Sequence, residues 1–262
     1  RAVDEAVKLL ELVDNDLGAA GAILESRRAR RENAPPLLVE GLIPRGEITL
    51  LTGVAKTGKS SLLTQLAACI ATGQPFLGLP VNSPNRRVVI ITGEDSPPTI
   101  AERLDRLGID EATQDQIIVM PGGELAERLQ QASKLKPDLL VVDPARAFCK
   151  GDEDGSDAPS TFFDQLYNFA RETGAAVIVA HQRTKDSRPR SLSEIVPRGS
   201  QVWTDRPRMS LGFLRRKDGQ SVFGVRTLDG IPQHNLPPSA NVRTEPLVLE
   251  FDKEASRFTP TK

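Results

Sequence analysis

Residues 48–60 read ITLLTGVAKTGKS, and this stretch decides the fold. Ile48 to Thr52 form an apolar, β-branched run that is typical of a buried strand. Gly53 to Ser60 fit the pattern G-x-x-x-x-G-K-[ST] in full. A helical pattern from Lys59 to Thr72 follows, and Gly73 is a good residue to end it. The sequence therefore predicts a strand that runs into a glycine loop, which opens directly into a helix.

Each part of this loop suits the binding of a nucleoside triphosphate. Glycine lets the backbone curl so that N–H groups point at phosphate oxygens, and the helix N-terminus adds the positive end of its dipole. Lys59 would neutralise the β- and γ-phosphates, and the Ser60 hydroxyl would be a ligand of Mg²⁺. The alternative interpretation is a glycine turn beside a surface lysine. The residues expected to contact the nucleotide are Gly53, Val54, Ala55, Lys56, Thr57, Gly58, Lys59, Ser60 and Ser61.

Strand and helix patterns alternate after this loop. Further buried strands are predicted at Arg87–Thr92, Ile117–Met120, Asp138–Asp143 and Ala175–Ala180, and helices at Ser96–Leu107, Glu124–Leu135 and Ser160–Thr173. Buried strands separated by helices imply an α/β fold with a parallel sheet covered on both faces. The C-terminal part adds antiparallel strands: a hairpin of Met209–Leu214 and Ser221–Thr227, then Leu247–Phe251.

Two acidic residues end predicted strands. Asp143 ends the run DLLVVD, where a Walker B carboxylate would hold the Mg²⁺ shell, although it could also simply start a turn before Pro144. Glu94 ends the run VVIITGE, and we expect it to be the general base that orients the attacking water. Asp95 could instead cap the helix that begins near Ser96, a structural role.

His181 follows the strand AVIVA at the same predicted edge of the sheet. A polar group there could sense the γ-phosphate and transmit its loss to the loop that follows. Gln182 competes for that role, and a lone histidine is often a structural hydrogen-bonding residue.

The loop from Arg183 to Ser200 is polar, basic and marked by proline and glycine. We expect its cations to contact the phosphate backbone of DNA, mostly by electrostatics because few aromatic residues are available to stack on bases. A solvated surface loop is the alternative interpretation. The predicted DNA contacts are Arg183, Lys185, Arg188, Arg190 and Arg198.

The bulk properties set further limits. The net charge of −1 excludes a uniformly basic nucleic-acid binder but not a local basic strip. No apolar run is long enough to span a bilayer, and two cysteines, expected to be reduced packing residues, suit the cytoplasm. Residues 1–36 are predicted to be a helical segment whose apolar stripe could pack on a neighbouring subunit, and 37–262 the main domain. Because the chain opens with Arg1, we expect a fragment of a longer protein.

Several motifs occur in the order seen in one known family. They are LVEGLIPRGEITLLTGVAKTGKSSL, ITGED, LLVVDPARAF, GDEDGSD, VIVAHQRTK and RGSQVWTDRPRMSLGFLRR. Together they resemble the RecA-like, RepA-type ATPases, which are hexameric replicative helicases of plasmids and related mobile elements. The resemblance covers roughly residues 37 to 227. The chain differs in having His181-Gln182 where the family often has two histidines, and Asp154 where it often has asparagine.

The resemblance implies a RecA-like P-loop NTPase core, a homo-hexamer, ATP and Mg²⁺, and translocation on single-stranded DNA. It implies Lys59 and Ser60 as phosphate and metal residues, with Asp143 as the Walker B aspartate. It also implies Glu94 as catalytic glutamate and His181 as γ-phosphate sensor. Arg208 falls at the position of the family's arginine finger, which the residues alone do not distinguish from Arg215 or Arg216. Other functions that remain open are a recombination mediator, a regulatory or loader ATPase, and a nucleotide-switched scaffold.

Overall fold

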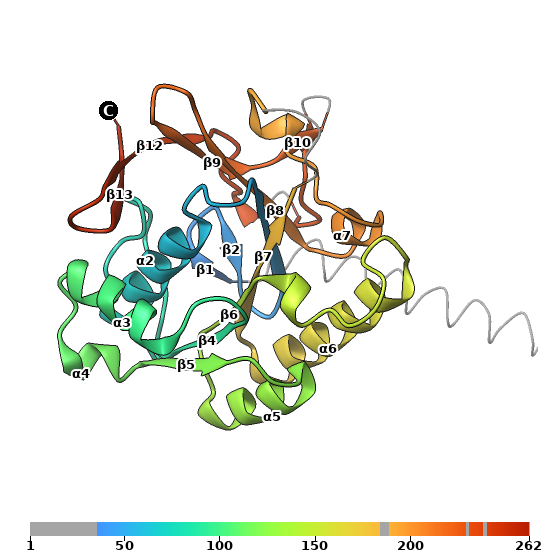
Figure 1. Ribbon diagram of the computed structural model, residues 1–262, viewed down its shortest axis with the longest axis horizontal. Helices are drawn as coiled ribbons and strands as arrows, with labels where there is room; N and C mark the ends of the chain where they lie inside the picture. Colours follow the sequence, from blue (N-terminus) through green and yellow to red (C-terminus); the bar gives the residue numbers. More distant parts are fainter. Residues whose placement is uncertain (1–35, 184–188, 229–230, 238–239, 262) are drawn as a thin grey trace, which may run out of the picture.

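One large mixed sheet organises the residues described by the computed structural model, which are 36–183, 189–228, 231–237 and 240–261 (Figure 1). Its nine strands lie in the order β13-β12-β9-β8-β3-β7-β6-β4-β5. The six strands from β8 to β5 in this order are mutually parallel. At the other end of the sheet, β8 and β9, β9 and β12, and β12 and β13 pair antiparallel. The helix predicted within residues 1–36 lies outside the described residues, apart from residue 36.

The predicted elements appear with small shifts at their ends. The parallel strands are β3 (Ile48–Gly53), β4 (Val88–Thr92), β5 (Ile117–Pro121), β6 (Leu139–Asp143), β7 (Ala176–Gln182) and β8 (Met209–Arg215). The antiparallel strands are β9 (Ser221–Val225), β12 (Leu247–Asp252) and β13 (Arg257–Pro260). The main helices are α2 (Lys59–Thr72), α3 (Pro97–Arg106), α5 (Leu125–Leu135) and α6 (Asp157–Thr173). The fold is therefore the predicted α/β core with added antiparallel strands.

Several short elements were not predicted. They are β1 (Leu37–Val39), β2 (Ile43–Pro44), α4 (Glu111–Gln114), η1 (Ala145–Ala147), η2 (Leu192–Glu194), α7 (Val202–Asp205), β10 (Thr227–Leu228) and β11 (Ile231–Pro232). Two predicted bounds were wrong. Helix α6 begins three residues earlier than Ser160, and Thr227 belongs to β10 rather than to the β8–β9 hairpin.

Helices cover both faces of the parallel strands, as the continuous apolar runs predict. Helices α2 and α3 lie on one side of the sheet, and α5 and α6 lie on the other (Figure 1). All six residues of β3 are buried, with Leu51 in the core under α2 and Leu50 in the core under α6. Successive side chains of a strand point to opposite faces, so each central strand contributes to both cores.

Both cysteines are free thiols, in agreement with the expected packing role. Burial raises the pKa of Cys69 and of Cys149 to about 11, so both are protonated at neutral pH. Within the described ranges, no helix combines the length and the apolar character needed to cross a bilayer.

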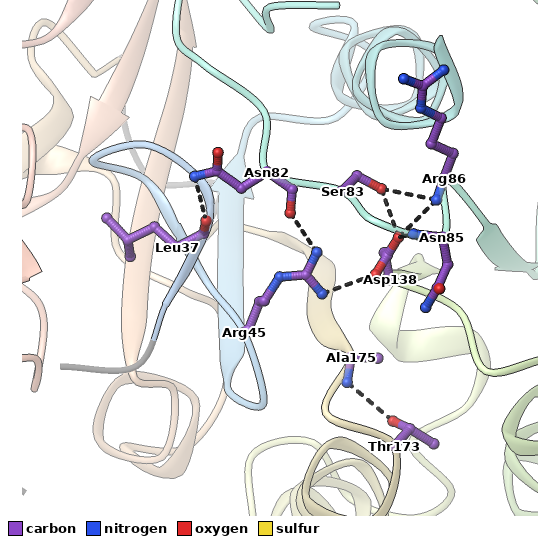
Figure 2. A network of polar contacts seen from close by, with 9 residues as sticks. All are labelled: Leu37, Arg45, Asn82, Ser83, Asn85, Arg86, Asp138, Thr173 and Ala175. Carbon is purple, nitrogen blue, oxygen red and sulfur yellow. Dashed lines mark hydrogen bonds and ion pairs between the residues drawn. The ribbon is translucent and has the colours of Figure 1, made fainter. Parts of the chain in front are cut away.

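A buried carboxylate joins three segments at the amino edge of the sheet (Figure 2). Asp138, which directly precedes β6, is 1% exposed and forms an ion pair with Arg45 at 2.9 Å. Its other oxygen accepts hydrogen bonds from the Ser83 hydroxyl at 2.6 Å and from the backbone N–H groups of Asn85 and Arg86, both at 2.8 Å. This carboxylate therefore holds the β2–β3 turn and the 82–87 loop against the start of β6.

Replacing Asp138 with alanine should destabilise the fold strongly. The change removes the ion pair with Arg45 and the shared acceptor of the Ser83 hydroxyl and of two N–H groups in the 82–87 loop, so we expect a loss of about 3 kcal/mol in the free energy of unfolding. Urea denaturation followed by circular dichroism measures it. Glu172→Ala, on an exposed position of α6, is the control and should change stability by less than about 0.5 kcal/mol. Equal midpoints for the two variants would contradict the role given to this network.

Candidate functional site

The carboxyl ends of the parallel strands bring the predicted residues to one edge of the sheet. In the register of β3 and β7, Thr52 lies opposite His181 and Gly53 lies opposite Gln182. In the register of β4 and β6, Thr92 lies opposite Asp143. The glycine loop leaves β3 at this same edge, so residues far apart in the sequence meet beside it.

The glycine loop has the backbone that its sequence predicts. Lys56 and Gly58 have φ values of 61° and 103°, in the left-handed region that favours glycine. Gly58 is the N-cap of α2, and its carbonyl accepts the N–H of Leu62 at 2.9 Å. The Thr57 hydroxyl donates to the Val54 carbonyl at 2.8 Å, which fixes the curl of the loop. The first turn of α2 therefore directs free N–H groups at the space beside the loop.

Lys59 lies almost completely buried under this loop, with 9% of its surface exposed. Its Nζ donates to the carbonyls of Gly53 at 3.1 Å and Val54 at 3.0 Å. Burial lowers the pKa of Lys59, and the nearby carboxylates of Asp143 and Glu94 oppose this effect. A dehydrated ammonium group here would interact strongly with an anion, because few water molecules remain to screen it.

Asp143 ends β6 beside the start of α2. Burial raises the pKa of its carboxyl group, while the Ser60 hydroxyl and the Lys59 ammonium group lower it. Asp143 also shares a small cavity of about 10 Å³ with Ser60, Thr92 and Asp95. Hydroxyl and carboxylate oxygens are the ligands that Mg²⁺ prefers, so this group of side chains fits the predicted metal site.

Glu94 follows β4, and its carboxylate forms an ion pair with Arg146 of η1. The neighbouring Asp95 does not cap α3, because Ser96 accepts the N–H of Thr99 and is the N-cap. Asp95 instead forms a two-pronged ion pair with Arg103, at 2.5 and 3.2 Å. The alternative of Asp95 as a helix cap is therefore wrong, and the sequence did not reveal Arg146 as a partner of Glu94.

His181 is 2% exposed, and its ring contacts the Arg198 carbonyl and Trp203 of α7. Its Nε2 is 2.7 Å from the carbonyl oxygen of Arg198, so this nitrogen carries the proton and donates it. The imidazole stacks on Trp203, with ring centroids 4.1 Å apart and planes at 12°. Burial, with the nearby cations, lowers the pKa of His181 to about 4, so the ring is neutral at pH 7. Trp203 was missed because one tryptophan in a short helix carries no sequence signal.

The basic loop is only partly as predicted. Arg183 is 6% exposed, so it does not lie at the surface, where a DNA contact would need it. Lys185 and Arg188 lie outside the described residues, while Arg190 and Arg198 are exposed. The described part of the loop is anchored on β8 and β9 by a small apolar cluster of Leu192, Ile195, Leu214 and Val222.

The three candidate finger residues lie at opposite ends of β8. Arg208 precedes the strand at the amino edge, where its N–H donates to Ile48 and its Nε lies 3.3 Å from a Glu47 carboxylate oxygen. Arg215 and Arg216 lie at the carboxyl edge. With Lys217 and Arg190 they line a cleft of about 950 Å³ beside Val54 and Thr57 of the glycine loop. Arg208 is thus remote from the loop of its own chain, and the other two are adjacent to it.

A sequence profile described as "AAA domain" matches residues 18–188, which is more than half of the chain. The chain belongs to this AAA domain family. The parallel sheet, with the glycine loop at its carboxyl edge, is the RecA-like P-loop NTPase core of such ATPases.

Similar curated proteins carry the name DNA repair protein RadA. The RadA of Aquifex aeolicus (strain VF5) is 29% identical over 163 residues, which cover 60% of this chain and 33% of that protein. The RadA of Mycobacterium tuberculosis (strain CDC 1551 / Oshkosh) is 28% identical over 163 residues, covering 60% and 31%. That of Chlamydia pneumoniae is 32% identical over 106 residues, covering 40% and 20%. The chain therefore matches a third or less of the length of these relatives.

The buried neutral imidazole in this AAA domain should make stability depend on pH. His181 has a pKa of about 4 when folded, against about 6.5 when unfolded, so between these values only the unfolded chain binds the proton. Acidification from pH 7 to pH 5 should therefore lower the free energy of unfolding by about 2 kcal/mol more in the wild type than in His181→Gln. Urea denaturation at both pH values measures this. The same pH dependence in both proteins would contradict a buried neutral His181.

Proposed function

We propose that the AAA domain binds ATP with Mg²⁺ at the carboxyl edge of the sheet and hydrolyses it. The observation that carries the proposal is the convergence of Lys59, Asp143, Glu94 and His181 beside the glycine loop. A buried lysine, a helix N-terminus and the oxygen atoms of Ser60 and Asp143, which could bind Mg²⁺, together favour a triphosphate over other anions.

Lys59 would exchange its bonds to the carbonyls of Gly53 and Val54 for bonds to the β- and γ-phosphates. Ser60 and Asp143 would hold Mg²⁺, which supplies positive charge to offset the charge that develops on the phosphates. Glu94 would orient and deprotonate the water that attacks the γ-phosphorus. Each role uses a group that the fold already places at this edge.

His181 is suited to report the γ-phosphate to the basic loop. Its Nε2–H donates to the backbone carbonyl of Arg198, so a movement of the imidazole acts directly on the end of the loop. The next residue is coupled as well, because the Gln182 carbonyl accepts the N–H of Arg198 at 3.0 Å. We infer that phosphate release moves Arg198 and, with it, the DNA contacts of Arg190 and Arg198.

The finer function that we propose is a ring, expected to be a hexamer, that moves on single-stranded DNA as a RepA-type helicase. Arg208 supports a ring because it lies at the amino edge, roughly 16 Å from the loop of its own chain for a strand of this length. It would serve as an arginine finger only for a neighbouring subunit. Its Glu47 pair, with side chains 33% and 20% exposed, would open on assembly.

A second candidate function is favoured by the similar proteins, which are named as DNA repair proteins. In that case the same ATPase would drive a repair step rather than replication. Both functions predict that single-stranded DNA stimulates hydrolysis. Strand displacement from a forked duplex separates the two functions, because a RepA-type helicase must show this activity. The hydrolysis rate of a nucleotide-switched scaffold would not respond to DNA.

The phosphate and finger assignments can be tested together. Lys59→Ala should lose nucleotide affinity and turnover, because the ammonium group that meets the phosphates is gone. Arg208→Ala should bind nucleotide normally but hydrolyse it at least about 100-fold more slowly. Mixing the two inactive variants should restore part of the activity, since hybrid interfaces pair an intact loop with an intact finger. Steady-state phosphate release measures turnover by Lys59→Ala, by Arg208→Ala and by their mixture. Normal turnover by Arg208→Ala would refute its assignment as the arginine finger.

The DNA contacts should appear in the salt dependence of binding. Replacing both Arg190 and Arg198 with alanine removes two phosphate contacts, so the slope of log K against log salt should fall in magnitude by about 1.4 for a single strand. Fluorescence anisotropy with labelled oligo-dT measures it, and Lys253→Ala in the exposed β12–β13 turn is the control. An unchanged slope would contradict a DNA-binding role for these two arginines.

A further inference from the structure

The ion pair between Arg146 and Glu94 has no role in the mechanism proposed above. It joins η1, which follows β6, to Glu94, the second residue after the neighbouring strand β4. The side chains are 50% and 53% exposed. The pair thus occupies the Glu94 carboxylate, which would have to accept a proton from water.

The backbone places Arg146 beside Glu94. The Gly93 N–H donates to the Asp143 carbonyl at 3.0 Å, and the strand end lies so close to η1 that a Cβ added at Gly93 would be 2.1 Å from the Ala147 Cβ. Only glycine allows this approach, so the contact between η1 and the end of β4 is built into the sequence ITGED.

Arg146 also lies beside His181, the predicted γ-phosphate sensor. Arg146 lines a small cavity with His181, Gln182 and Arg198. Arg146 therefore borders both the Glu94 carboxylate and the residues at the end of β7, where a terminal phosphate would be sensed.

We propose that Arg146 is a positioning residue shared between the Glu94 carboxylate and the terminal phosphate of a bound triphosphate. When the triphosphate binds, the guanidinium moves to it and frees Glu94 to orient water. The inference rests on the proposed function, because it takes Glu94 as the base and the glycine loop as the triphosphate site. A diphosphate lacks the group that draws Arg146 away, so it leaves the pair closed.

The neighbouring ion pair shows why Arg146 is suited to move. Asp95 and Arg103 are joined by two hydrogen bonds and are only 24% and 22% exposed, which favours a fixed arrangement. Arg146 and Glu94 are joined by a single contact between half-exposed groups, and such pairs are weak. A phosphate with two negative charges would compete for the guanidinium more effectively than one carboxylate.

The test is a double-mutant cycle on nucleotide binding, which needs no turnover. In the presence of Mg²⁺, calorimetry measures the dissociation constants of the non-hydrolysable analogue AMP-PNP and of ADP from the protein. The proteins compared are the wild type, Glu94→Gln, Arg146→Ala and the double variant. If Arg146 is shared, Glu94→Gln releases it and tightens AMP-PNP binding. The factor by which Glu94→Gln tightens AMP-PNP binding should be at least about threefold larger when residue 146 is arginine than when it is alanine. ADP binding should show no such coupling.

Equal tightening in the two backgrounds would overturn the inference, because general removal of negative charge would then explain the effect. Arg146→Gln gives a second cycle in case the alanine variant fails to fold. The matched control is the exposed pair Arg106–Glu102 on α3, for which a Glu102→Gln and Arg106→Ala cycle should show no coupling to AMP-PNP. A wild-type protein that binds no AMP-PNP would instead refute the proposed function itself, so the two failures are distinct.

Discussion

The parallel register of the central strands is the constraint on which the candidate site depends. Because β3, β4, β6 and β7 all run in the same direction, their last residues must meet at one edge. The register then sets the pairs: Thr52 is level with His181, and Thr92 with Asp143. Both faces of each strand are buried, so a shift by one residue would exchange the two cores and is strongly disfavoured. The same hydrophobic packing that stabilises the fold thus holds the polar residues in place.

Low solvent exposure gives these polar residues their properties. Burial lowers the pKa of both Lys59 and His181, and it leaves His181 a neutral hydrogen-bond donor at pH 7. Their partners differ. Lys59 has Asp143 and Glu94 nearby, whereas His181 has a carbonyl oxygen and the face of Trp203. The contact between His181 and the Arg198 carbonyl therefore links the carboxyl edge of the sheet directly to the basic loop.

The sequence predicted what local patterns encode. Apolar runs gave the five buried strands, the glycine pattern gave the loop, and strand ends gave Asp143, Glu94 and His181 as neighbours. It did not predict the contacts that depend on how distant segments pack: the pairing of Arg146 with Glu94, the stacking of His181 on Trp203, or the burial of Arg183. Long polar side chains can point to either side of the backbone, so their partners are decided by packing rather than by spacing in the chain.

The most direct test of a triphosphate site at this edge is a crystal structure with Mg²⁺ and AMP-PNP. We expect the β- and γ-phosphates within hydrogen-bond distance of Lys59 Nζ and the N–H groups of the glycine loop, with the metal between Ser60 and Asp143. Phosphates bound instead in the cleft between Arg190 and Lys217, with Lys59 still donating to Gly53 and Val54, would contradict it.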